Sequence, residues 1–274
     1  MTSTLSAPTP AHLGGSGTPI VLLHGVDMSW RAWAPVIPLL EKHHTVYVPT
    51  LAGHRGGPPL PAGSVGIGAI ADALERQLDE LGWQRAHFAG NSLGGWLSLE
   101  MAQRGRAESV IAFSPAGAFS SWWAARRLVW LLRVIGLIAR LPGMERLLRF
   151  RAVRYALGRP VWHRPQQLDA AGALEVLHDL RACTALEVLI AGAKAEGPPS
   201  FSIADVPIRI AWARRDRLIP FRSYGRPYLE LLPDAEGITL DGVGHVPMSD
   251  DPALVAETIL AFTQPQSEPA EKAS

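Results

Sequence analysis

One serine of the chain stands between two glycines in a pattern that can do chemistry. Gly90, Ser92 and Gly94 form G-x-S-x-G between an apolar run at 86–89 and a helical pattern at 93–104. A tight strand-to-helix turn strains the backbone of the serine, and side chains at the two glycine positions would crowd it. The pattern therefore predicts a nucleophile elbow with Ser92 as the attacking residue.

A serine hydroxyl needs a base and an orienting acid to act as a nucleophile at neutral pH. In chains with such an elbow, the acid and then a histidine follow the serine. Asp216 comes just after an apolar run at 207–212, and His245 comes just after another at 237–240. Parallel strands end at the same sheet edge, so we expect both side chains to meet Ser92 there.

Other carboxylates lie near His245 in the sequence. Asp241, Asp250 and Asp251 flank His245 so closely that we do not expect them to orient its ring from the proper side. Asp216 has three arginines among its near neighbours, so the alternative that it is an ordinary ion-paired surface residue stays open.

A histidine–glycine pair ends the first apolar run. His24 and Gly25 follow residues 20–23, and a turn here leaves the next backbone N–H free to point into a cleft. The N–H of Leu93, at the start of the predicted helix, would be a second donor. Two such donors would bind the oxyanion of a tetrahedral intermediate, whereas His24 itself is expected to brace the loop.

Apolar runs alternate with helical patterns along most of the chain. Strands are predicted at 20–23, 45–48, 86–89, 109–113, 207–212 and 237–240. Helices are predicted at 33–40, 67–81, 93–104, 222–232 and 252–262. This alternation predicts the α/β class, with a mostly parallel central sheet of about six strands covered by helices on both faces.

The segment at 118–200 interrupts this alternation. It shows helical patterns without a clear strand, and about 80 residues are too many for a simple crossover, so we expect a helical cap over the carboxyl edge of the sheet. The α/β core is then formed by 19–117 and 201–263. The composition of the ends predicts a flexible arm at 1–18 and a disordered tail at 264–274.

Composition excludes several classes of protein. The net charge of +1 provides no overall basic field for nucleic acid. The first residues lack a secretory signal pattern, and no uncharged apolar stretch is long enough to span a bilayer. The single cysteine, Cys183, allows neither an internal disulfide nor a cysteine-based zinc site. We expect a cytoplasmic protein that acts on a small molecule without a metal or cofactor.

Taken together, the motifs resemble the α/β-hydrolase superfamily. The matching segments are IVLLHGVDMSW, LAGHRGG, GNSLGGWLSLEMA, WARRDRLIP and GVGHVPMSDDP. The resemblance implies Ser92 as nucleophile, Asp216 as acid and His245 as base, with the backbone N–H groups of Val26 and Leu93 as oxyanion donors. Members usually have an antiparallel hairpin before the H-G strand, and no strand pattern precedes it here, so that hairpin is expected to be missing.

The resemblance also limits the chemistry. It implies a serine hydrolase that acts on a small to medium ester, thioester or related acyl substrate through an acyl-enzyme. Haloalkane dehalogenases and epoxide hydrolases of the superfamily use aspartate at the elbow, so Ser92 argues against both. Carbon–carbon bond hydrolysis and cofactor-free perhydrolase chemistry use the same triad and stay open, as does a non-catalytic ligand-binding protein on this fold.

The first half of the expected cap is strongly basic. Residues 118–165 contain ten arginines and one acidic residue, Glu145, which gives +9 and leaves −8 for the rest of the chain. Within it, 122–141 carries three tryptophans. We favour an apolar roof over the pocket with the arginines in water. Contact with an anionic membrane surface is the second interpretation, and steering of an acidic substrate is the third.

Overall fold

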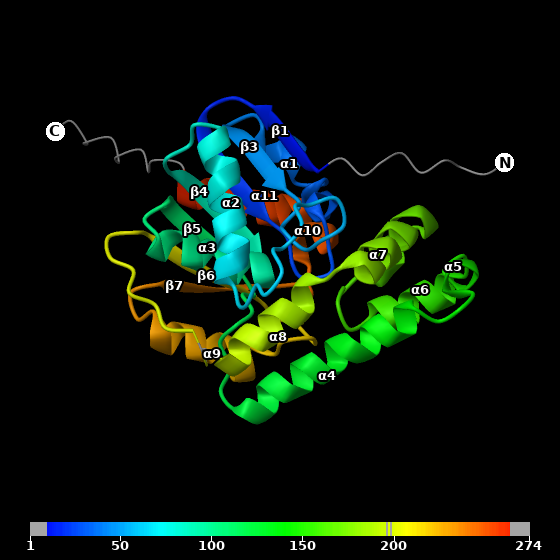
Figure 1. Cartoon of the computed structure of the whole chain (residues 1–274). Coiled ribbons are helices and arrows are strands. Elements are labelled where there is room, and N and C mark those ends of the chain that lie inside the picture. Colours follow the sequence, from blue (N-terminus) through cyan, green and yellow to red (C-terminus); the bar gives the residue numbers. More distant parts are fainter. Residues whose placement is uncertain (1–9, 196, 198, 264–274) are drawn as a thin grey trace.

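A twisted seven-stranded sheet forms the centre of the computed structural model, which describes residues 10–195, 197 and 199–263 (Figure 1). The strand order is β1-β3-β2-β4-β5-β6-β7. β1 pairs antiparallel with β3, and the other neighbouring pairs are parallel. The strands are β1 (Ala11–Gly15), β2 (Thr18–Leu23), β3 (His44–Pro49), β4 (Ala86–Asn91), β5 (Ala107–Phe113), β6 (Ile208–Ala213) and β7 (Glu236–Leu240). The predicted α/β class with a mostly parallel sheet is confirmed.

Helices cover both faces of this sheet. One layer contains α2 (Gly68–Glu80), α3 (Leu93–Gln103) and α9 (Phe221–Leu231). The other contains α1 (Ile37–Leu40), α10 (Pro247–Asp250) and α11 (Pro252–Thr263). In β2, Val21 and Leu23 pack in the first layer, whereas Ile20 and Leu22 pack in the second. Successive strand side chains point to opposite faces, so a continuous apolar run suits a strand that is covered on both sides.

The helix predicted at 33–40 is interrupted. The chain instead forms a 3₁₀ turn, η1 (Trp30–Trp33), followed by the short helix α1. Pro35 lies between the two pieces, and Pro38 lies in the first turn of α1, where a missing N–H costs no helical hydrogen bond.

Strand β1 corrects the expected flexible arm. Residues 11–15 pair with β3 from Ala11 opposite Pro49 to Gly15 opposite Thr45, so the prediction of an arm was wrong over this stretch. The sheet accordingly has seven strands rather than about six. Strand β1 precedes β2 in the chain. β1 and β2 each pair with β3 and do not pair with each other. Residues 1–9 and the tail predicted at 264–274 lie outside the described residues.

The segment between β5 and β6 is helical, as expected for the cap. It contains α4 (Trp122–Ala139), α5 (Met144–Leu147), α6 (Arg151–Gly158), η2 (Pro165–Gln167), α7 (Ala170–Ala182) and α8 (Ala185–Ala195) (Figure 1). Polar contacts tie α7 to the core. Ser29 Oγ donates a 2.8 Å hydrogen bond to Asp179 Oδ2, and Arg55 Nη2 lies 2.7 Å from Glu175 Oε2. None of the described helices is long and apolar enough to cross a membrane.

Candidate active site

Ser92 occupies the tight turn between β4 and α3. Its backbone has φ 56° and ψ −114°, a positive-φ conformation that is strained for a residue with a Cβ. The two glycines permit this turn. A Cβ on Gly90 would collide with the carbonyl oxygen of Gly94, and a Cβ on Gly94 would collide with the carbonyl oxygen of Leu23. The strained serine therefore depends on backbone packing that only glycine allows at these two positions.

Asp216 and His245 meet in the loops that follow β6 and β7. Asp216 Oδ2 accepts a 2.7 Å hydrogen bond from His245 Nδ1, and both side chains are almost fully buried. The other carboxylate oxygen of Asp216 accepts from the backbone N–H groups of Leu218 and Ile219, at 3.0 and 2.8 Å. With Nδ1 engaged, Nε2 is the ring nitrogen that remains for proton transfer.

The loop that holds His245 is fixed from two sides. Its backbone N–H donates to Val161 in the cap at 2.9 Å, and its carbonyl oxygen accepts from Asn91 Nδ2 at 2.8 Å. Asn91 is the residue that precedes Ser92. The position of His245 is thus linked directly to the elbow and to the cap.

The three other carboxylates near His245 have different partners. Asp241 forms an exposed ion pair with Arg214. Asp250 is buried and accepts from the backbone N–H groups of His163, Arg164 and Gly244 at 2.7–2.9 Å. Asp251 accepts from Leu254 N–H at 3.1 Å at the start of α11. The imidazole of His245 has its carboxylate contact with Asp216.

The predicted oxyanion donors lie next to the elbow. Val26, Gly25 and Ser92 line one cavity. Leu93 is the first residue of α3, where a backbone N–H has no partner within the helix. Val26 thus lines the cavity at Ser92, Leu93 directly follows Ser92 in the chain, and their role as oxyanion donors stays a prediction.

His24 braces the loop that carries Val26. Its Nε2 accepts a 2.9 Å hydrogen bond from Leu51 N–H, so Nδ1 carries the proton and donates to the Gly25 carbonyl oxygen at 2.8 Å. Complete burial and the neighbouring His54 hold the pKa of His24 well below its ordinary value. A neutral ring with both nitrogens engaged fits the expected structural role.

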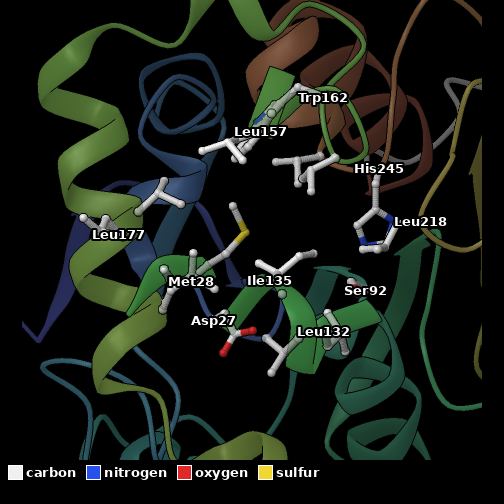
Figure 2. Close-up of a pocket in the computed structure, with 18 of the residues that line it drawn as sticks. Asp27, Met28, Ser92, Leu132, Ile135, Leu157, Trp162, Leu177, Leu218 and His245 are labelled. Carbon is white, nitrogen blue, oxygen red and sulfur yellow. The ribbon is translucent and has the colours of Figure 1, made fainter. Parts of the chain in front are cut away.

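The cavity at Ser92 has a volume of about 190 Å³ and is mostly apolar. Figure 2 shows Ser92 and the ring of His245 on the same side of it. Core and cap both contribute to its wall. Cap residues include Leu128, Leu132, Ile135, Leu157, Trp162, Val176 and Leu177. The arrangement suits an apolar group held beside a nucleophile.

Asp27, which no pattern in the sequence marked as functional, also lines this cavity (Figure 2). Its φ is 64°, and burial raises the pKa of its carboxyl to about 6. It is hydrogen-bonded to the Cys183 thiol, whose pKa burial and Asp27 raise to about 12. Asp27 also lines a second hollow of about 370 Å³ between α4, α7 and α8. The only signal in the sequence was its place directly after the H-G-V run.

Comparisons with known proteins agree with this fold. The sequence matches the Alpha/beta hydrolase family over residues 20–258. It is 33% identical over 202 residues to a Mycobacterium tuberculosis protein named Epoxide hydrolase EphH, covering 71% of this chain and 94% of that protein.

Two solved structures share the fold at low sequence identity. A 2-hydroxy-6-oxo-6-phenylhexa-2,4-dienoate hydrolase from a Rhodococcus strain has a TM-score of 0.71 and 19% identity, covering 93% of this chain and 97% of its own. The naproxen esterase of Bacillus subtilis has a TM-score of 0.68 and 21% identity, covering 95% and 90%. With the family match and the similarity to the mycobacterial protein, the chain belongs to the alpha/beta hydrolase family and is a hydrolase.

Proposed function

We propose that this hydrolase cleaves a small to medium ester, thioester or related acyl substrate through a covalent acyl-enzyme. One observation supports it most directly. His245 lines the same cavity as the strained Ser92, and its ring is held by Asp216 at 2.7 Å. A serine, a histidine and a buried carboxylate in this relation are the parts that acyl transfer requires.

In this mechanism, Ser92 Oγ attacks the carbonyl carbon of the substrate while His245 Nε2 takes the hydroxyl proton. Asp216 holds the imidazole and stabilises its charged form. The N–H groups of Val26 and Leu93 bind the tetrahedral oxyanion. His245 then protonates the leaving group, and a water molecule repeats the sequence to release the acid and restore Ser92.

The volume of the cavity supports the proposed size of the acyl group. Its volume of about 190 Å³ is below the range of about 300–1,000 Å³ that is typical of pockets for drug-sized ligands. Its wall offers mainly aliphatic side chains, so an apolar acyl chain of short to medium length fits it better than a charged or very long one.

A panel of p-nitrophenyl esters from acetate to palmitate, run beside an acyl-CoA series, tests the proposal. We expect kcat/KM to be highest for short to medium chains and to fall towards palmitate. Ser92→Ala is the control. Absence of turnover on every ester and thioester, together with no labelling of Ser92 by a fluorophosphonate, would contradict acyl transfer and favour a ligand-binding role for the site.

Epoxide opening is a second candidate, because a relative that aligns with 71% of this chain is named an epoxide hydrolase. The chemistry of Ser92 disfavours it. Attack of a serine oxygen on an epoxide carbon would give an ether, which has no carbonyl carbon for water to attack, so the enzyme would not be regenerated. Sustained turnover of styrene oxide that is lost in Ser92→Ala would reverse this preference.

Carbon–carbon bond hydrolysis and perhydrolase chemistry would use the same three side chains. A protein named 2-hydroxy-6-oxo-2,4-heptadienoate hydrolase is 37% identical over 100 residues, and a putative non-heme haloperoxidase is 35% identical over 91 residues. Each alignment covers about a third of this chain. Assays with a 2-hydroxy-6-oxo-dienoate and with acetate plus hydrogen peroxide separate these reactions from ester hydrolysis.

A further inference from the structure

Helix α4 presents two different faces. Its inner face contributes Leu128, Leu132, Ile135 and Ile138 to the wall of the cavity. Helix α4 lies at the outer edge of the cap (Figure 1). The residues of its outer face follow a spacing of three and four residues, which keeps side chains on one stripe of a helix. We call this stripe the outer face of α4: Trp123, Arg126, Trp130, Arg133 and Leu137.

The apolar members of this outer face are exposed. Trp123, Trp130 and Leu137 have 76%, 64% and 67% of their surface accessible. Roofing the cavity at Ser92 accounts for the inner face only, because none of these three side chains lines that cavity, and Leu137 alone of the three lines the second hollow. Large apolar side chains that lie together on a surface mark a contact site. Tryptophan in particular is enriched where a protein meets the headgroup region of a bilayer.

The charges that helix α4 itself carries are of one sign, and the acidic residue that contacts this face, Glu187 of α8, pairs with Arg133. Arg126 and Arg133 alternate with the tryptophans, and 122–139 contains no acidic residue. Over the whole cap, 118–200, twelve basic residues stand against six acidic ones, which gives +6 and leaves −5 for the rest of the chain, so the positive end of the molecule lies at the cap. An anionic surface would therefore attract the cap, repel the core and turn the outer face of α4 towards itself.

We propose that the outer face of α4 docks on an anionic lipid surface, with the tryptophans in the headgroup layer and the arginines against lipid phosphates. A second copy of the chain fits this face less well, since two such caps would bring like charges together. Nucleic acid also fits less well, because Leu137 offers it neither stacking nor charge. The proposal adds a location to the proposed function and does not depend on it.

Docking in this way would bring the site close to the lipid. The inner and outer faces belong to one helix, whose diameter with side chains is about 10 Å. The cavity beside Ser92 would then lie about one helix diameter from the headgroup layer. This one consequence rests on the proposed function: the ester that the cavity takes would come from, or partition into, the membrane surface.

Co-sedimentation with vesicles of phosphatidylcholine, with and without phosphatidylglycerol, tests the docking. We expect pelleting that requires phosphatidylglycerol and weakens at high salt, since the Debye length is about 8 Å at physiological ionic strength. Each basic residue near an anionic surface contributes about fivefold to binding, so R126Q should lower the partition coefficient about fivefold. Arg133 is left in place because it pairs with Glu187 at 3.0 Å.

Three further variants sharpen the test. W123S/W130S should reduce binding at least tenfold while leaving hydrolysis of a soluble ester unchanged, because neither tryptophan lines the cavity. K42Q removes the same charge from an exposed position of the core and should bind like the wild type. Ser92→Ala should also pellet like the wild type, so failure of docking and failure of the proposed chemistry are distinguishable.

Two results would overturn the proposal. One is the absence of pelleting with anionic vesicles, or pelleting that is the same in R126Q and K42Q. The other is self-association in solution that W123S/W130S abolishes while vesicles are not bound, which would assign the outer face of α4 to a second copy of the chain.

Discussion

Asp216 and His245 come from the ends of two neighbouring strands and meet through a 2.7 Å hydrogen bond between Oδ2 and Nδ1. The geometry of this pair is set by backbone, because two N–H groups of the loop after β6 hold the second oxygen of Asp216. The carboxylate is therefore oriented before any substrate arrives, and it orients the imidazole in turn. This relation makes the proposed roles of individual side chains testable.

The first prediction concerns the nucleophile. Ser92→Ala should lower kcat on the best ester by about 10⁴–10⁶-fold, because no other group can form the acyl-enzyme. The thermal midpoint should change little, since alanine keeps the Cβ and removes only the hydroxyl. Steady-state kinetics and fluorophosphonate labelling of the same preparations measure both effects. Turnover near the wild-type rate would remove Ser92 from the mechanism.

The second prediction separates two aspartates. Asp216→Asn should lower kcat by about 10⁴-fold with the fold retained, because an amide cannot stabilise a charged imidazole and can favour the wrong tautomer. Asp241→Asn is the matched control. It removes a carboxylate that lies just before the His245 loop in the sequence, and that carboxylate pairs with Arg214 at the surface. A larger loss of activity in Asp241→Asn than in Asp216→Asn would show that the acid has been assigned to the wrong residue.

Much of the core could be predicted because its signals are local. A strand buried on both faces needs an uninterrupted apolar run, and β2, β3, β5 and β6 each have one. β1 was missed because Ala-His-Leu-Gly-Gly is neither apolar nor alternating. It is a strand because the edge of β3 offers it hydrogen-bond partners, and that is a property of the assembled sheet rather than of the segment itself.

The residues of the site likewise fall into those that the sequence could place and those that it could not. Ser92, Asp216 and His245 could be placed because strand ends of a parallel sheet share one edge. Asp27 could not, since a loop carboxylate is usually solvated and its burial follows from the cap packing over it. The exposure of Trp123 was also unpredictable, because an apolar helix is expected to bury its tryptophans and only the tertiary arrangement shows which face lies outside.

The third prediction concerns the glycines of the elbow. Gly94→Ala should destabilise the fold by about 1–3 kcal/mol or more, since its Cβ would collide with the carbonyl oxygen of Leu23 in the centre of the sheet. Gly68→Ala is the control, because its Cβ would meet only the end of the Arg104 side chain at 3.5 Å. Denaturant unfolding of both variants measures the difference. A Gly94→Ala protein as stable as Gly68→Ala would contradict the packing described at the elbow.

The last prediction uses the pH dependence of Asp27. Burial raises the pKa of this carboxyl from 3.8 to about 6, so the folded state binds a proton more tightly than the unfolded state does. The contribution of Asp27 to the free energy of unfolding should therefore fall as pH rises from about 4 to about 6, and stay low above that. A shift of this size corresponds to about 3 kcal/mol.

Asp27→Asn removes this titration, and asparagine tolerates the positive φ of the position. We expect the variant to gain stability relative to the wild type as pH rises from about 4 to about 7, because only the wild type must then bury a charge. Urea unfolding at several pH values measures the difference, and exposed Asp234→Asn controls for the loss of one negative charge. A difference between Asp27→Asn and wild type that does not change with pH would mean that Asp27 is solvated rather than buried beneath the cap.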